Sequence, residues 1–480
     1  MFDSPANGSS ESSRTRPTIF VLYGATGDLS RRQILPAFYE LARLGRMPAR
    51  WRLVGNGRGD LSESDFQHYV EGVLRAFAPT LSPAAWKEFS QHLRFAGDGF
   101  DTDGAGSLLD VLAEAELELA GETRGDVQYV HYLAIPPSAF LELTRDLEAH
   151  GFVERSRVVY EKPYGTSLAN FEQLDAEVQR VFAEGQIYRV DHILALEAMQ
   201  DVVHARFTNP WLAAIWNRQH IAQVQVDIPE TLDVAQRASF YDSTGAFLDV
   251  VVTHLFQMAA TVAMGPPSDL SPGALRQARD AALQRFRELD PAEVVLGQFV
   301  GYTDIEGVPS DSQTDTLAAA RLWVDDERWH GVPFLLRSGK KMAADEQRVT
   351  LVLKDPDEGP YAGSDLPPST ISFALHGGGE ISMSTTVRRP GLEGGIVQGV
   401  AKLSLEDLDG ATTAMPYAHL IDHVLSGNQS LFTGADGLRA VWTCIEPILN
   451  NRPQVLPYAT GSWEPEAVNA LAMPGRWFLS

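Results

Sequence analysis

Residues 18–30 read TIFVLYGATGDLS, and this stretch decides the fold. Its first six residues are mostly apolar and rich in β-branched and aromatic side chains, which is typical of a buried strand. Gly24 and Gly27 follow at once and predict a tight turn into a helix. At such a turn a pyrophosphate can approach free backbone N–H groups. Many strand-to-helix turns use a glycine pair, and the complete G-x-G-x-x-G pattern is missing, so a dinucleotide site is a hypothesis at this point.

Alternating strand and helix patterns continue over the first 165 residues. Lys162 follows the last of these strand candidates, at the end where parallel sheets bind ligands. The alternation predicts an α/β, doubly wound domain. The expected strands are 18–23, 51–54, 127–134 and 157–160, and the expected helices are 61–77, 83–93 and 108–120.

The residues after the second expected strand bear on the choice of coenzyme. Arg58 comes first and Asp60 two residues later. An arginine in this place suits the 2′-phosphate of NADP, and an acid suits the ribose hydroxyls of NAD. We therefore expect NADP and leave NAD possible; the alternative is that Arg58 is an exposed loop residue without a ligand.

The chain after residue 200 has a different pattern. Consecutive strand signals predict a β+α domain with a large, mostly antiparallel sheet. A sheet of that size is also a candidate surface for a homodimer or homotetramer. We expect a disordered tail at 1–16, a dinucleotide-binding domain at 17–190, and a substrate and dimerisation domain at 191–480. The strand signals lie at 222–228, 299–302, 317–324, 332–337, 348–353, 370–374, 380–387 and 399–405.

Length and composition exclude several classes of protein. The 480 residues predict two domains. A net charge of −24 argues against general nucleic-acid binding. The sequence has no run of eighteen apolar residues, so we expect no membrane span, and the polar N-terminus lacks the apolar core of a secretion signal. A single cysteine, Cys444, leaves no internal disulfide and no Cys-rich metal site. These features favour a cytoplasmic protein.

Two histidines are candidates for acid–base chemistry. Residues 187–200, IYRVDHILALEAMQ, place His192 beside Asp191 after a short apolar run. An imidazole held by a carboxylate can take the proton of an alcohol while hydride leaves its carbon. The alternative is a loop or helix N-cap without chemistry. His254 lies on an apolar helix five residues after Asp249, a spacing that need not share a face, and such a histidine is more often a core residue.

Several stretches in the same order resemble glucose-6-phosphate dehydrogenases over nearly the whole chain after the tail. The resemblance implies a Rossmann-type coenzyme domain, a β+α domain with a large antiparallel sheet, and a dimer or tetramer. It also implies oxidation of C1 of a sugar to a lactone with NADP or NAD, without a metal. The stretches are GATGDLSRRQILPAFY, YLAIPP, EKPYG, IYRVDH with Glu197, WNRQHIAQVQV, YDSTGAFLDVVVTHLFQM, WHGVPFLLRSGKKM, PYAHLIDHVLSGNQSLF and LPYATGSWEPEA.

The resemblance also assigns roles to individual residues. His254 is similar in position to the general base, Asp191 to the carboxylate that supports it, and His192 to a contact of the sugar phosphate. His192 is then a substrate contact and no longer the candidate base. Lys162 resembles a lysine that contacts substrate and coenzyme. The remaining matches are Glu230, Asp249 and Lys340 for the sugar, and Gly24, Thr26, Gly27, Asp28 and Arg58 for the coenzyme.

The sequence departs from the family at the phosphate end of the sugar site. Ile193 and Leu196 stand where a tyrosine and a lysine are usual, Asp345 replaces a basic residue, and Gln33 replaces a lysine near the coenzyme turn. Losing one charged contact to a phosphate costs ~2–5 kcal/mol. The leading hypothesis is a C1 dehydrogenase of a sugar without the usual 6-phosphate. The alternatives are glucose-6-phosphate dehydrogenase proper, with Lys341 repairing the site, and a non-catalytic coenzyme-binding paralogue.

Overall fold

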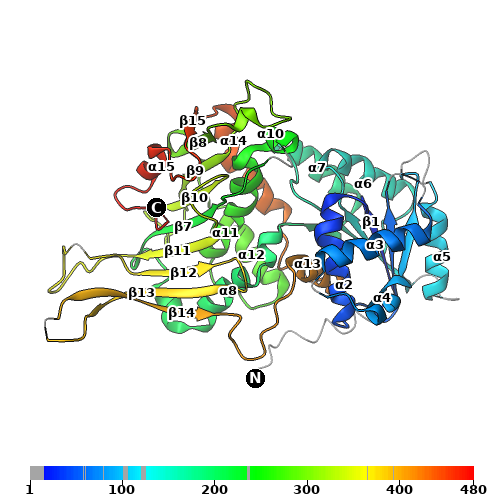
Figure 1. Cartoon of the computed structure of the whole chain (residues 1–480), viewed down its shortest axis with the longest axis horizontal. Coiled ribbons are helices and arrows are strands. Elements are labelled where there is room, and N and C mark those ends of the chain that lie inside the picture. Colours follow the sequence, from blue (N-terminus) through cyan, green and yellow to red (C-terminus); the bar gives the residue numbers. More distant parts are fainter. Residues whose placement is uncertain are drawn as a thin grey trace. The chain divides into compact units, whose positions relative to one another are not determined.

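The computed structural model describes residues 16–57, 59, 61–78, 80–100, 106–120, 126–234, 238–364, 366–392 and 394–479 (Figure 1). Residues 1–15 of the expected tail, and also Arg58 and Asp60, lie outside the described residues. The chain forms two compact units. Unit 1 comprises Met1–Ala195, Pro267–Gln277 and Ala414–Ala435, and unit 2 comprises Leu196–Pro266, Ala278–Thr413 and Asp436–Ser480. The domain limits expected from the sequence stay a prediction.

Unit 1 contains a six-stranded sheet in which every pair of neighbours is parallel. The order β3-β2-β1-β4-β5-β6 is that of dinucleotide-binding folds, which confirms the expected fold class. The strands are β1 (Thr18–Tyr23), β2 (Trp51–Asn56), β3 (Leu93–Ala96), β4 (Gln128–Leu133), β5 (Ser156–Tyr160) and β6 (Ile187–Arg189).

Helices accompany this sheet and complete its core (Figure 1). Three of them begin at a serine whose hydroxyl accepts a backbone N–H, at Ser62, Ser82 and Ser167. The helix expected at 83–93 ends earlier, at Ser90, because the chain turns there into β3, which the sequence analysis missed. The helices are α2 (Leu35–Arg43), α3 (Glu63–Phe77), α4 (Pro83–Ser90), α5 (Leu108–Ala120), α6 (Phe140–Ala149) and α7 (Leu168–Val181).

A distant segment of the chain completes unit 1. Helix α13 (Pro416–Ser426) packs on α2, and Arg46 pairs with Asp422 at 2.9 Å.

Glu161, at the end of β5, is buried and accepts a hydrogen bond from the Tyr132 hydroxyl at 2.7 Å. Burial raises the pKa of the Glu161 carboxyl to about 7, although Tyr132, Lys162 and Tyr417 lower it. The contribution of this buried carboxyl to the free energy of unfolding therefore depends on pH.

Unit 2 contains a nine-stranded sheet with the order β14-β13-β12-β11-β7-β10-β9-β8-β15. Neighbours are antiparallel except for β7–β10 and β8–β15, so the expected large, mostly antiparallel sheet is confirmed. The strands are β7 (Ile221–Pro229), β8 (Val294–Phe299), β9 (Leu317–Leu322), β10 (Phe334–Gly339), β11 (Arg348–Leu353), β12 (Thr370–Ala374), β13 (Glu380–Arg388), β14 (Ile396–Ser404) and β15 (Val455–Tyr458).

The strand expected at 299–302 is wrong. Strand β8 ends at Phe299, and a short 3₁₀ turn, Tyr302–Asp304, follows. Gly301 lies between them with φ +92°, a left-handed conformation that ends the extended chain. The apolar run FVGY therefore spans a strand end and a turn.

The helices of unit 2 include one long apolar run. Helix α10 (Ala238–Ala246), the π-helix η7 (Phe247–Leu255) and α11 (Phe256–Ala263) follow one another directly. By length and composition alone the run Tyr241–Ala263 could cross a membrane, but 83% of its apolar window is buried in the fold, as is usual for a core helix. The other helices are α8 (Glu197–Thr208), α9 (Pro210–Ile215), α14 (Ala435–Asn450) and α15 (Glu466–Leu471), with α12 (Pro272–Leu283) crossing the limit between the units.

A buried ion pair fixes the C-terminal segment to the sheet of unit 2. Arg337 on β10 donates to Asp227 on β7 at 2.7 Å, and the side chains are 0% and 3% exposed. The guanidinium carbon of Arg337 lies 4.1 Å from the ring centre of Trp477, and Arg337 also donates to the Leu479 carbonyl oxygen at 2.7 Å. A planar guanidinium can serve a carboxylate, a ring and a carbonyl together.

Arg337→Met should therefore destabilise the protein by about 3–5 kcal/mol, because it leaves the Asp227 carboxylate buried without its cation. Urea unfolding measures this change. The double variant Asp227→Leu with Arg337→Met should recover part of the loss, and the exposed Arg388→Met is the control. A single Arg337 variant as stable as the wild type would contradict this account.

Glu161→Gln should change how stability depends on pH. The folded pKa of Glu161 is raised from 4.5 to about 7. Its contribution is therefore fully present below pH 4.5 and is lost as the pH rises to about 7, by about 3 kcal/mol. The difference in unfolding free energy between wild type and variant should follow that curve. Glu177→Gln is the control, because hydrogen bonds from Arg180 and Arg145 hold the pKa of Glu177 below its usual range. Parallel wild-type and Glu161→Gln curves between pH 5 and 8 would contradict the assignment.

Candidate active site

The residues expected to bind the coenzyme lie in unit 1, apart from Arg58, which is outside the described residues. They follow the carboxyl ends of β1 and β5, and parallel pairing brings these ends to one edge of the sheet. The structure thus places the glycine turn and the lysine on the same edge. We call this group the coenzyme set: Gly24, Thr26, Gly27, Asp28 and Lys162.

The turn after β1 requires a glycine at position 24. Gly24 has φ +76°, and a Cβ atom there would lie 2.3 Å from the Ala134 carbonyl oxygen. The Gly24 N–H donates to the Asn56 carbonyl oxygen at 2.9 Å, and the Gly27 N–H donates to the Gly24 carbonyl oxygen at 2.9 Å. These backbone bonds, together with the Ser30 hydroxyl that donates to the Gly24 carbonyl oxygen at 2.8 Å, close the turn, and the glycine lets it pack directly against the Ala134 carbonyl.

Cationic side chains also lie at this turn. Arg31 and Arg32 pair with Asp28 at 2.7 and 2.8 Å, and all three side chains are largely exposed. The hydrogen bond from Arg32, followed by that from Arg31, lowers the pKa of Asp28. Exposed guanidinium groups are suited to phosphate. The turn and its charges therefore fit the phosphates of a dinucleotide.

Two further predicted residues share this edge of unit 1. Asp191 and His192 follow β6, which is the parallel neighbour of β5. Asp191 is 6% exposed, and its Oδ1 accepts the N–H of Ile193 at 3.1 Å. The ring of His192 is half-buried and stacks on Tyr417 with 6.0 Å between ring centres. The Asp191 side chain therefore bonds a nearby backbone N–H, as expected for a loop or helix N-cap. Asp191 also lies at the edge of the sheet where parallel sheets bind ligands.

Four of the residues expected to bind the sugar come from the second half of the chain, and these lie in unit 2. Glu230 follows β7 and Lys340 follows β10, and these strands are parallel neighbours. Lys340 Nζ pairs with Glu230 Oε1 at 2.5 Å, and the side chains are 15% and 24% exposed. The Glu230 N–H donates to the Gly339 carbonyl oxygen at 2.8 Å, which fixes the two strand ends to each other. We call Glu230, Asp249, His254 and Lys340 the sugar set.

Helix η7 carries the other two members of the sugar set. It is a π-helix, in which an N–H bonds the carbonyl five residues earlier. Asp249 and His254 are therefore one helical turn apart, although the same spacing in an α-helix would not align them. His254 is 5% exposed, and η7 packs on β9 and β10. Short π-helical segments are rare and occur at functional sites.

Asp315 positions this helix, and the sequence analysis missed it. Its side chain is completely buried, and Oδ2 accepts the N–H of Phe247, the first residue of η7, at 2.7 Å. Arg452 pairs with the same carboxylate. Gly245 has φ +69°, and a Cβ atom there would lie 2.5 Å from Asp315 Oδ1. No local pattern marks Asp315, because its partners lie 68 or more residues away.

Three residues at which the sequence departs from the pattern that it resembles are Ile193, in unit 1, and Leu196 and Asp345, in unit 2. Ile193 is 3% exposed and belongs to the interior of unit 1, whereas Leu196 is half-buried. Asp345 is exposed. Lys341, the cation considered as a repair, pairs with Asp233 at 3.3 Å.

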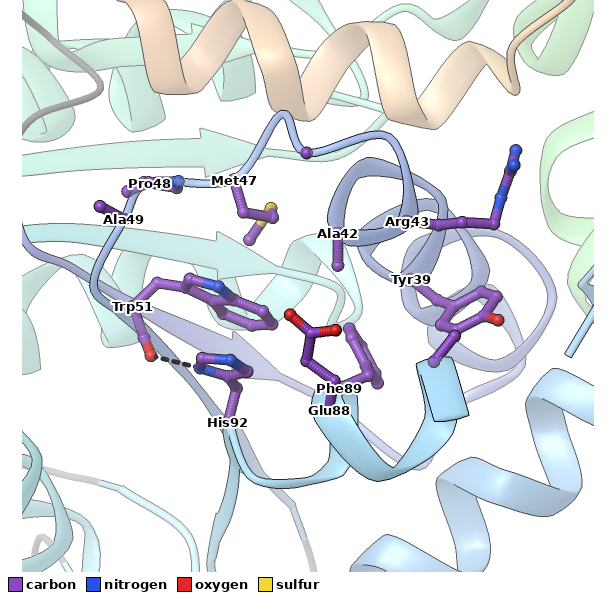
Figure 2. Close-up of a pocket in the computed structure, with 12 residues that line it drawn as sticks. Tyr39, Ala42, Arg43, Met47, Pro48, Ala49, Trp51, Glu88, Phe89 and His92 are labelled. Atoms are coloured by element: carbon purple, nitrogen blue, oxygen red, sulfur yellow. Dashed lines mark hydrogen bonds between the residues drawn. The ribbon is translucent and has the colours of Figure 1, made fainter. Parts of the chain in front are cut away.

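A cavity in unit 1 is separate from all these residues. Figure 2 shows it beside the stacked rings of Trp51 and His92, whose centres are 4.1 Å apart. Its volume is about 210 Å³, and its lining includes Tyr39, Met47 and Phe89. Trp51 is the first residue of β2, so the cavity lies toward the amino ends of the strands, away from the coenzyme set.

Comparison with known proteins covers nearly the whole chain. Residues 21–201 match the sequence model described as "Glucose-6-phosphate dehydrogenase, NAD binding domain", and residues 203–477 match "Glucose-6-phosphate dehydrogenase, C-terminal domain". The glucose-6-phosphate 1-dehydrogenase of Aggregatibacter actinomycetemcomitans is 31% identical and the match covers 95% of this chain and 96% of that protein. Glucose-6-phosphate 1-dehydrogenase 6, cytoplasmic, of Arabidopsis thaliana is 30% identical, with coverage of 94% and 90%.

Solved structures agree with this result. A glucose-6-phosphate dehydrogenase in complex with its substrate glucose 6-phosphate has a TM-score of 0.88 at 27% identity, with coverage of 97% of this chain and 99% of that one. A glucose-6-phosphate 1-dehydrogenase from Mycobacterium avium has a TM-score of 0.84 at 28% identity and the same coverage. Both halves of the sequence, and the fold of both units, thus lead to one conclusion: the chain belongs to the glucose-6-phosphate dehydrogenase family.

Proposed function

We propose that this oxidoreductase removes hydride from C1 of an aldose and converts the C1 hydroxyl to the carbonyl of a lactone. The observation that carries the proposal is the sugar set. Glu230 and Lys340 are joined at the ends of parallel strands, and His254 stands one helical turn from Asp249 in the same unit. Carboxylates and an ammonium group suit sugar hydroxyls, and an imidazole suits their protons. The coenzyme of the family is NADP; its replacement by NAD stays a prediction.

Each residue has a distinct task in this proposal. His254 takes the proton of the C1 hydroxyl, and Asp191 stabilises the imidazolium that results. Glu230, Asp249 and Lys340 orient the sugar, and His192 binds its far end. Lys162 contacts both sugar and coenzyme. Bound NADP supplies the hydride acceptor.

Glucose 6-phosphate is the first candidate substrate. Curated relatives that match over 90% or more of their length are named glucose-6-phosphate 1-dehydrogenases, and a structural neighbour holds glucose 6-phosphate as its substrate. His192 would then bind the phosphate. The activity would make the chain a glucose-6-phosphate 1-dehydrogenase in the strict sense.

An aldose without the 6-phosphate is the second candidate, and specific residues favour it. Ile193 and Leu196 offer no cation after His192, and Asp345 adds a negative charge. In a chain of net charge −24, a phosphate dianion with fewer cations is poorly compensated. Each lost charged contact would cost ~2–5 kcal/mol of binding.

We also propose a homodimer or a homotetramer, and a cytoplasmic location. One face of the β13–β14 pair is apolar: Met383, Val387 and Leu403 are 36%, 45% and 48% exposed, and the register places them on the same side. An exposed apolar face on the two outermost strands of the sheet suits a second copy of the chain. Two relatives, from Arabidopsis thaliana and Solanum tuberosum, are named cytoplasmic.

NADP reduction should be measured by absorbance with glucose 6-phosphate and with glucose. A phosphate site would give at least about a hundredfold preference in kcat/KM for the 6-phosphate, whereas a ratio near one would favour the second candidate.

The variant His254→Ala should lower kcat by about 10²–10⁴-fold and leave NADP affinity within about twofold, because it removes only the base. The exposed His330→Ala is the control. No turnover of either sugar, or full activity of His254→Ala, would contradict the proposal.

Met383→Glu with Leu403→Glu should convert an oligomer into a 52.6 kDa monomer, because two buried charges would face each other across the interface. Light scattering after gel filtration measures the mass. Val400→Glu is the control, since Val400 lies on the opposite face of the same strand. A wild-type protein that is monomeric at micromolar concentration would contradict the oligomer, and an unchanged oligomer in the double variant would exclude this face.

A further inference from the structure

Tyr241 is the unusual tyrosine of unit 2. Its side chain is 4% exposed, and within the described residues its hydroxyl is buried with no hydrogen-bond partner. The buried hydroxyls of Tyr302 and Tyr458 in the same unit do have partners, the Asp242 carboxylate at 3.0 Å and the Lys340 carbonyl oxygen at 2.6 Å. A buried unpaired hydroxyl costs about 1–3 kcal/mol, so its position calls for an explanation.

The surroundings of Tyr241 are those of the sugar set. Lys340 Nζ lies 5.7 Å from the centre of the Tyr241 ring, and Lys340 is itself joined to Glu230. Burial is the main cause that raises the pKa of the Tyr241 hydroxyl. The nearby acidic groups of Asp315, Asp249, Tyr458 and Glu230 raise this pKa further. Acidic groups thus lie around the hydroxyl, but none of them reaches it.

Hydrogen-bond chemistry indicates what is missing. An ionised carboxylate only accepts hydrogen bonds, so Glu230 or Asp249 would accept a hydrogen bond from a sugar hydroxyl. The oxygen of that sugar hydroxyl then needs a donor. Lys340 offers a charged donor that is already paired with Glu230. The Tyr241 hydroxyl is an uncharged donor beside it without a partner.

We propose that Tyr241 is a substrate-binding and specificity-determining residue, whose hydroxyl donates to the oxygen of a sugar hydroxyl that in turn donates to Glu230 or Asp249. The inference rests on the proposed function, because it requires the sugar set to bind a sugar. It adds to that function a reason to prefer a fully hydroxylated aldose over a deoxy-sugar. A site that hydrogen-bonds a substrate hydroxyl rejects the analogue that lacks it, since its own polar groups stay unpaired.

The test compares Tyr241→Phe with wild type. The substrate is whichever of glucose 6-phosphate and glucose the wild type turns over better, with its 2-deoxy, 3-deoxy and 4-deoxy forms. We expect KM for the complete sugar to rise about five- to tenfold, with kcat and NADP affinity changed less than about threefold. We also expect discrimination against one deoxy-sugar to disappear in the variant. The melting temperature should not fall, because no protein hydrogen bond is lost.

Tyr39→Phe is the matched control, because Tyr39 in unit 1 is equally buried and its hydroxyl also lacks a partner. It should leave KM for every sugar unchanged. Unchanged KM and unchanged deoxy-sugar discrimination in Tyr241→Phe would overturn the inference while wild-type turnover upholds the proposed function. A wild type that turns over no aldose would overturn both.

Discussion

The backbone hydrogen bonds between parallel strands are the interaction on which both residue sets depend. In unit 1 they bring the ends of β1, β5 and β6 to one edge, where the coenzyme set, Asp191 and His192 lie. The sheet of unit 2 is mostly antiparallel, yet its parallel pair β7–β10 carries Glu230 and Lys340 side by side. A shift in either register would separate residues that the proposed reaction requires side by side, so the strand pairing is a precondition of that proposal.

Buried polar side chains then hold these elements in place at a cost in stability. Asp315 is completely buried so that it can bind the first N–H of η7, the helix with Asp249 and His254. Burial raises the pKa of Asp315, and Arg452 partly offsets this. Glu161, the residue before Lys162, shows the same balance: burial raises the pKa of its carboxyl, and neighbouring groups partly offset this. Apolar side chains could fill the same space more favourably, so we infer that these groups serve to position the residues of the proposed site.

Local patterns predicted most of the fold. The limits of β1 and of α5 agree with the sequence analysis, because apolar runs bounded by glycine, serine or turns decide them. The strand at 299–302 failed because Gly301 ends it, and β3 was missed because four residues give little periodicity. The π-helical alignment of Asp249 with His254, and the surroundings of Asp315 and Tyr241, were not predictable. They depend on contacts between residues far apart in sequence, which no spacing within one segment reveals.

The central claim is that hydride leaves C1 of an aldose for the nicotinamide, and isotope transfer tests it most directly. The sugar that is turned over should be supplied with deuterium at C1, and the NADPH formed should be analysed by proton NMR. The account predicts one deuterium at C4 of the nicotinamide and a slower reaction when hydride transfer limits the rate. NADPH without deuterium would contradict it, because the hydride would then come from another position.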